Sequence, residues 1–117
     1  MGGLYHLHSQ DAGRNWGTPI QLDGISGRNP TLAYNTKGQA FAVWPTVIDG
    51  KSHLKAHHIM TDESQVASGP AHQITQAPSD HQYPILLHDG RAFHLFWTHT
   101  ESGKSRTLHR TTESLLF

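Results

Sequence analysis

The octapeptide S-Q-D-A-G-R-N-W at residues 9–16 sets the pattern of the first predicted hairpin. Ser9 and Asp11 carry side-chain oxygens that accept hydrogen bonds from backbone N–H groups inside a turn. Gly13 supplies the positive φ that a tight reversal requires. Trp16 is predicted to fold back and fill the space beneath the turn. The octapeptide is therefore predicted to be a hairpin turn held by its own side chains.

The segments on both sides of this turn alternate apolar and polar residues, which predicts a strand at residues 4–8 and another at residues 18–22. In this context the pattern Ser-x-Asp-x-Gly-x-x-Trp resembles the Asp-box of the sialidase (neuraminidase) and BNR-repeat family. In that family the Asp-box joins the third and fourth strands of a β-propeller blade, on the face away from the ligand. The resemblance implies a structural role for the four fixed positions, Ser9, Asp11, Gly13 and Trp16.

A repeat of a little over 50 residues runs through the chain. Residues 29–44 align with residues 83–97, and the octapeptide aligns with a segment around residue 62. The alignment pairs Pro30 with Pro84, Trp44 with Trp97, Asp11 with Asp62 and Pro19 with Pro70. A repeat of this length with four strand-like runs has the size of one propeller blade. Trp44 and Trp97 are expected to end second strands and to pack against a neighbouring blade.

The repeat divides the chain into three expected segments: a half blade with the Asp-box (1–24), a complete blade (25–77) and an incomplete blade (78–117). Turn signals at Asp49-Gly50, His88-Asp89-Gly90 and Ser102-Gly103 separate the strands. The expected strands are residues 4–8, 18–22, 30–35, 39–45, 52–60, 71–75, 83–88, 91–99 and 105–112. A degenerate Asp-box is expected at residues 60–67, and residues 111–114 occupy the place of a third.

No segment of ten or more residues shows the apolar period of a helix, so the expected class is all-β. The nine strands amount to about two and a quarter four-stranded antiparallel blades, whereas a ring needs about four to eight. We therefore expect a partial six-bladed propeller. It is either a piece of a longer sialidase-like protein or is completed by homo-oligomerisation, for example as a trimer.

The amino-acid composition disfavours several classes of binding partner. Nine basic and nine acidic residues balance in 117, which disfavours nucleic acid and anionic membranes as partners. No apolar run is long enough to span a membrane, and there is no cysteine for disulfides or thiolate metal sites. Eleven histidines are spread along the chain. We expect them to be half-exposed strand residues that make the surface pH-sensitive near pH 6, with His6 and His8 as the one i, i+2 pair. No metal and no cofactor is expected.

Candidate site residues come from the resemblance. Sialidases bind the substrate carboxylate with three arginines and use a tyrosine nucleophile with a glutamate partner and an aspartate acid/base. Arg28-Asn29-Pro30 matches the family's Arg-x-Pro motif, so the resemblance implies that Arg28 binds a carboxylate. The repeat alignment places Tyr83 in the same central region. The catalytic candidates are therefore Tyr83 and Asp80, and the substrate-binding candidates are Arg28 and His81.

Two functional classes follow. The first is part of an exo-glycosidase that acts on sialylated or related glycans. The second is a propeller module that binds a glycan, a protein or a small anionic ligand without hydrolysis. Because no Tyr/Glu pair and no second or third arginine is assigned, this chain alone is expected to be inactive. The resemblance favours an extracellular or periplasmic location, although the chain shows no signal peptide.

Overall fold

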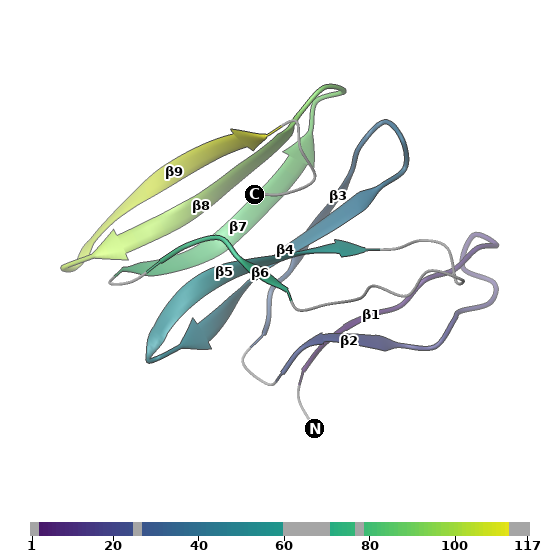
Figure 1. The fold of residues 1–117 in the computed structure, drawn as a ribbon, viewed down its shortest axis with the longest axis horizontal. Coiled ribbons are helices and arrows are strands. Elements are labelled where there is room, and N and C mark those ends of the chain that lie inside the picture. Colours follow the sequence, from purple (N-terminus) through teal and green to yellow (C-terminus); the bar gives the residue numbers. More distant parts are fainter. Residues whose placement is uncertain (1–2, 25–26, 60–70, 77–78, 113–117) are drawn as a thin grey trace.

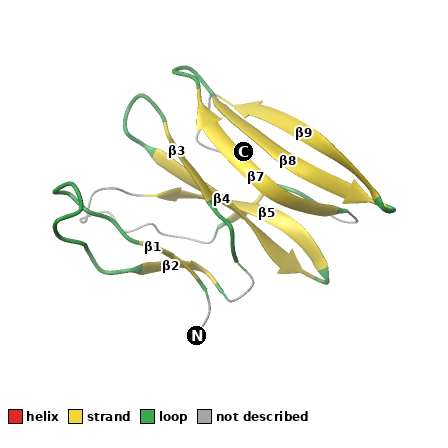
Figure 2. Ribbon diagram, turned by 180° about the vertical axis from the view of Figure 1, so that it is seen from behind, coloured by secondary structure: helices red, strands yellow, loops and turns green. Residues whose placement is uncertain are grey.

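All regular secondary structure in the described part of the chain is β-strand. The computed structural model describes residues 3–24, 27–59, 71–76 and 79–112. Their strands form three antiparallel sheets, which we call A, B and C (Figures 1 and 2). Sheet A contains β1 (Leu4–His6) and β2 (Ile20–Asp23). Sheet B contains β3 (Thr31–Tyr34), β4 (Ala40–Ile48), β5 (Lys51–Ile59) and β6 (His72–Gln73). Sheet C contains β7 (Asp80–His88), β8 (Phe93–Glu101) and β9 (Lys104–Thr112). The all-β class is confirmed.

Two hairpins share one turn geometry. β4 and β5 are joined by Asp49 and Gly50, whose φ angles are 51° and 79°, and β8 and β9 are joined by Ser102 and Gly103, with φ of 52° and 77°. Two consecutive residues with positive φ define the tight turn whose twist matches that of antiparallel strands. The Asp-Gly and Ser-Gly signals therefore act as the sequence predicts.

The internal repeat is present as a repeat of strand pairing. Adding 54 to the β3 numbers and 53 to the β4 and β5 numbers converts the pairs of sheet B into those of sheet C. The matching pairs are Thr31 with Val43 against Ile85 with Phe96, and Trp44 with Lys55 against Trp97 with Leu108. The same side-chain positions therefore face the same way in both sheets.

The three sheets pack on one another through two apolar layers. β4 is buried on both faces because it lies between sheets A and C. Phe41 and Val43 belong to the layer shared with sheet C, and Ala40, Ala42 and Trp44 to the layer shared with sheet A. A strand that is covered on both faces reads as a continuous apolar run, as this one does.

Both repeat tryptophans are core residues, as predicted. Trp44 is fully buried in the layer between sheets A and B, and Trp97 is buried between sheets B and C. The prediction that they end their strands is wrong, since β4 continues to Ile48 and β8 to Glu101. These extensions pair along their whole length with β5 and β9, which makes the hairpins nine residues deep.

Other strands also differ from their predicted bounds. β7 begins at Asp80 instead of residue 83, because residues 80–82 already pair with β8 before an irregularity between Gln82 and Ile85. β6 has only two residues, but the edge continues as Ile74 donates to the Leu54 carbonyl at 2.9 Å. β1 and β2 are also shorter than predicted. The degenerate Asp-box expected at residues 60–67 lies outside the described residues. The place of the third, residues 111–114, begins at the end of β9, and its residues 113 and 114 also lie outside them.

Sheet A departs from the repeat. Its pair Tyr5–Gln21 corresponds to Ala56–His72 in sheet B at an offset of 51 residues. Yet Tyr5 is exposed whereas Ala56 is buried, and Leu4 instead enters the layer with sheet B. The register shifts between Leu4 and Tyr5, and a bulge of this kind re-aims the side chains beside it.

Candidate functional site

A pocket of about 280 Å³ lies near the beginnings of β3 and β7, which we call their entrances. Its lining residues are Arg28, Asn29, Pro45, Ser52, Gln82 and Tyr83. Arg28 and Gln82 are equivalent in the repeat, as are Asn29 and Tyr83. The pocket, which we call the Arg28 pocket, is therefore built from the same position in two successive sheets. The structure brings two sequence-predicted residues, Arg28 and Tyr83, together in it.

The backbone is unusual at both entrances. Asn29 has φ of 50° and Tyr83 has φ of 57°, and each precedes a proline. Positive φ is uncommon outside glycine, and for a bulky residue such as tyrosine it is a genuine outlier. At Tyr83 it coincides with the irregularity in β7 pairing, which turns the side chain out of the sheet until it is 65% exposed. Strain of this kind is concentrated at functional sites.

The guanidinium of Arg28 gives the pocket a positive charge that can pair with a ligand. Its backbone N–H donates to the Pro45 carbonyl at 3.4 Å, which ties the entrance of β3 to β4. Its side chain is exposed, and its guanidinium has neither an ion pair nor a hydrogen bond with any side chain in the described ranges. A guanidinium in this state can donate a forked pair of hydrogen bonds to a carboxylate.

Asp80 stands behind the pocket and does not line it. One of its carboxylate oxygens accepts a hydrogen bond from the Ser52 backbone at 2.9 Å, and the other lies 3.7 Å from the Lys51 ammonium. The Ser52 hydroxyl in turn donates to the His81 carbonyl at 2.9 Å. These bonds fasten the start of β7 to the start of β5. Asp80 therefore positions Ser52, one of the lining residues.

His81 points away from the pocket into the layer between sheets B and C. It is buried, and its Nδ1 accepts a hydrogen bond from Trp97 Nε1 at 2.9 Å. The rings of His53 and His99 lie on either side, with centroids 5.6 and 5.1 Å away. Burial lowers the pKa of His81, and the two neighbouring imidazoles lower it further. The expectation of half-exposed histidines is wrong for His53 and His81, which fill space in the core.

The turn at residues 9–16 has the predicted hydrogen bonds. Ser9 Oγ accepts from the Gly13 backbone at 2.8 Å, and Asp11 accepts from the Asn15 backbone at 2.8 Å and from its amide at 2.6 Å. The bonds from Asn15 lower the pKa of Asp11. Gly13 has φ of 88°. Trp16 lies against Gly13, as predicted for a ring that folds back onto the turn, but it remains 58% exposed.

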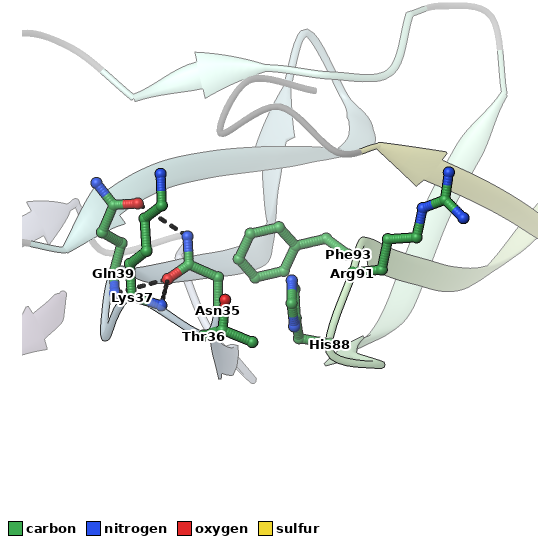
Figure 3. A pocket seen from close by; sticks show the side chains of 7 residues that line it. All are labelled: Asn35, Thr36, Lys37, Gln39, His88, Arg91 and Phe93. Atoms are coloured by element: carbon green, nitrogen blue, oxygen red, sulfur yellow. Dashed lines mark hydrogen bonds between the residues drawn. The ribbon is translucent and has the colours of Figure 1, made fainter.

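A second pocket, of about 320 Å³, lies at the other ends of β3 and β7, between the β3–β4 and β7–β8 turns (Figure 3). Its lining residues are Asn35, Thr36, Lys37, Gln39, His88, Arg91 and Phe93. The Asn35 side chain is committed to its own turn, since its oxygen accepts from the Lys37 and Gln39 backbones at 2.9 Å. None of the predicted site residues lies here.

Sequence reasoning did not name Pro45, Ser52 or Gln82 as site residues, although all three line the Arg28 pocket. Pro45 and Ser52 lie on β4 and β5 and belong to no motif, so only the fold brings them beside Arg28. Gln82 is the equivalent of Arg28 in the repeat, and this alignment is the sequence signal that could have identified it. Within the described ranges no group of three or more His, Asp or Glu side chains could hold a metal ion.

Comparison of the chain with protein-family models, with curated proteins and with solved structures gave no match. Among the described residues there is no helix long and apolar enough to cross a membrane.

Proposed function

We propose that this chain is a segment of a sialidase-like β-propeller and that the Arg28 pocket binds the carboxylate of an acidic sugar. One observation carries the proposal. The entrances of β3 and β7, which are equivalent in the repeat, meet in one pocket that holds the available guanidinium of Arg28 beside the exposed ring of Tyr83. Pockets that bind small ligands combine apolar or aromatic walls with a few placed polar groups.

The propeller part of the proposal is supported by the arrangement of the sheets. A turn with the Asp-box hydrogen bonds connects β1 to β2, and sheets B and C repeat the same pairing. The layers between successive sheets each contain an equivalent tryptophan. In a closed ring the remaining blades come from the rest of a parent chain or from further copies of this one.

Each lining group has a suitable task. Arg28 pairs with the carboxylate, and a charge-assisted, forked pair of this kind is stronger than a neutral hydrogen bond. The side-chain amides of Asn29 and Gln82 offer both donors and acceptors to sugar hydroxyls. The Tyr83 ring offers an amphipathic face with a hydroxyl at its tip. Together these groups select a sugar that carries one negative charge.

The pocket supports binding more than hydrolysis. Glycoside hydrolysis needs an acid/base group, and sialidases combine one with a tyrosine nucleophile. No carboxylate lines the Arg28 pocket among the described residues, and the nearby Asp80 is engaged by Ser52 and Lys51. We infer that the chain binds without turnover. If its parent is an exo-glycosidase, other blades supply the acid/base group; otherwise the protein is a non-catalytic binding module.

The test is a titration of the full chain with the methyl glycoside of sialic acid, in which binding is measured by NMR chemical-shift changes. Arg28→Ala is expected to weaken binding at least about tenfold, because a hydrogen bond to a charged group contributes about 1.5–3 kcal/mol. The matched control is Arg14→Ala, another exposed arginine, which lies in the Asp-box turn. Methyl glucoside, which lacks the carboxylate, is expected to bind neither protein.

Two results would contradict the proposal. Equal affinity of the wild type and Arg28→Ala for the sialoside would show that the Arg28 pocket is not the carboxylate site. Release of a fluorophore from a fluorogenic sialoside, abolished by Arg28→Ala, would keep the site but overturn binding without turnover.

A further inference from the structure

Two imidazoles from neighbouring strands converge on the outer face of sheet C, the face turned away from sheet B. His94 on β8 and His109 on β9 have ring centroids 5.3 Å apart and an angle of 10° between the rings. His94 Nδ1 lies 3.1 Å from His109 Nε2, so the two rings meet edge to edge with these nitrogens facing each other. The Thr111 hydroxyl lies 3.3 Å from the first nitrogen and 3.1 Å from the second. Three potential ligand atoms therefore lie at the corners of a small triangle.

Strand pairing fixes this arrangement. His94 pairs with Thr111 and Phe96 pairs with His109, so all four side chains project from the same face of two antiparallel strands. The Phe96 ring stacks on His109 at 4.4 Å with an angle of 9°. His109 thus contacts an aromatic ring on its face and the second imidazole at its edge. The two nitrogens are placed by the sheet and not by a mobile loop.

A carboxylate orients His94 from behind. Asp89 Oδ2 lies 2.7 Å from His94 Nε2, while Asp89 Oδ1 accepts from the backbones of Arg91 and Ala92 at 2.8 and 2.9 Å. The bond from the Ala92 backbone, with those from His94 and Arg91, lowers the pKa of Asp89 well below its usual range. An ionised Asp89 accepts the Nε2–H of His94, which leaves the lone pair on Nδ1. Carboxylates fix metal-binding histidines in this way.

The repeat shows that the pair is not a general feature of the fold. At the equivalent positions, 53 residues earlier, sheet B has Phe41 and Ala56, which are buried in the apolar layer under sheet C. The corresponding face of sheet C has two imidazoles instead. His94 retains 22% of its side-chain surface exposed, and His109 and Thr111 are exposed. The ligand atoms can therefore be reached from solvent.

We propose that His94 Nδ1 and His109 Nε2 bind a late first-row divalent cation such as Zn²⁺, with the Thr111 hydroxyl beside it and water in the remaining positions. Imidazole nitrogens suit zinc, copper and nickel. Two Zn–N bonds of about 2.0–2.1 Å at a tetrahedral angle place the nitrogens about 3.3 Å apart. The observed separation of 3.1 Å is close to this value, but the two nitrogens point at each other, so each ring must turn by roughly 40° to aim its lone pair at the cation.

Binding displaces a proton from the pair. Without a cation, one proton lies between the two facing nitrogens, because two lone pairs at hydrogen-bond distance would repel each other. In the neutral pair this is the Nε2 proton of His109. When the cation binds, that proton leaves Nε2 and the Nδ1 of the same ring takes one up from solvent, so both imidazoles are neutral ligands and no net proton is released.

The experiment is a calorimetric titration of the full chain with ZnCl₂, on protein without a histidine tag. One Zn²⁺ per chain is expected, and His94→Gln and His109→Gln are each expected to weaken binding at least about tenfold. Asp89→Asn is expected to weaken it by about 10–100-fold through the orientation of His94. The matched control is His6→Gln, which removes one imidazole of the His6–His8 pair, whose ring centroids are 6.4 Å apart. This variant is expected to leave the Zn²⁺ affinity unchanged.

NMR of the imidazole nitrogens supplies a second readout. Zn²⁺ is expected to shift His94 Nδ1 and His109 Nε2, and circular dichroism checks that every variant is folded. Unchanged Zn²⁺ affinity in both His94→Gln and His109→Gln would overturn the proposal. Shifts confined to other histidines, or an equal loss of affinity in His6→Gln, would also overturn it, because the metal would then bind elsewhere.

Discussion

The two tryptophans of the repeat occupy the same place in neighbouring sheets but give their indole protons to different acceptors. Trp44 Nε1 donates to the carboxylate of Asp23 at 2.6 Å, across the layer between sheets A and B. Trp97 Nε1 donates to His81 Nδ1 at 2.9 Å, within sheet C. The repeat therefore fixes the position of the ring and not its polar partner. The two layers therefore differ in the group that accepts the indole proton, a carboxylate in one and an imidazole in the other.

The surroundings of the two acceptors extend this difference. The Lys55 ammonium lies 4.0 Å from Asp23, so the layer between sheets A and B ends in a charged pair. His81 instead lies between two other imidazoles, and the Arg110 guanidinium lies 6.0 Å from the centre of the Trp97 ring. Equivalent apolar packing is thus combined with a carboxylate in one layer and with a neutral imidazole in the other.

The largest expected effect is the loss of either ring. Trp44→Ala and Trp97→Ala are each expected to lower the free energy of unfolding by about 3–5 kcal/mol, because each leaves a large cavity in a packed layer. Urea unfolding followed by circular dichroism measures this. Trp16→Ala is the control, since that ring is 58% exposed, and it is expected to change stability by about 0.5 kcal/mol or less. A comparable loss at Trp16 would contradict the assignment of the two core rings.

A smaller effect separates two leucines that are also equivalent. Leu86 on β7 is 5% exposed beneath sheet B, whereas Leu32 on β3 is 49% exposed because the described strands of sheet A do not cover it. Leu86→Ala is expected to cost about 2–5 kcal/mol of unfolding free energy, and Leu32→Ala about 0.5 kcal/mol or less. Thermal and urea unfolding of both variants provide the measurement. Equal losses would show that a further layer covers Leu32 in solution.

Sequence reasoning succeeded where the cause of structure is local. The Asp49-Gly50 and Ser102-Gly103 turns depend on residues that tolerate positive φ, and the alternation of apolar residues sets which face of each strand is buried. Trp44 and Trp97 could be assigned to the core because their spacing matches in the two repeats. In contrast, the exposure of Trp16 depends on what packs against the turn, which its own pattern does not specify.

The candidate site was predictable only in part. The repeat placed Arg28 and Tyr83 at equivalent entrances, and the structure puts them in one pocket. The irregularity in β7 was not visible in sequence, so the outward turn of Tyr83 and the inward turn of His81 could not be separated. Ser52 reaches the pocket only through the pairing of long hairpins, which depends on contacts distant in the chain.

The last prediction concerns pH, because protonation of the two indole acceptors, His81 and Asp23, changes the stability of the fold in different pH ranges. Burial lowers the pKa of His81 below its ordinary 6.5; the neighbouring His99 and His53 add to this, while a bond with the Gln76 backbone and the charge of Asp80 oppose it. The unfolded chain then binds more protons than the folded one just below pH 6.5. The contribution of neutral His81 to the free energy of unfolding is therefore fully present above pH 6.5. It falls as the pH decreases toward the pKa of His81 in the folded chain.

Asp23 responds at lower pH. Burial alone would raise the pKa of Asp23, but hydrogen bonds from Trp44 and the Gly24 backbone, with the Lys55 charge, lower it below 3.8. Its contribution is therefore present above pH 3.8 and is lost below it. His81→Gln is expected to flatten the stability profile just below pH 6.5 and Asp23→Asn only below pH 3.8, as measured by urea unfolding across pH. An unchanged slope below pH 6.5 in His81→Gln would place the acid-sensitive group elsewhere, with His6, whose pKa burial also lowers, as the next to replace.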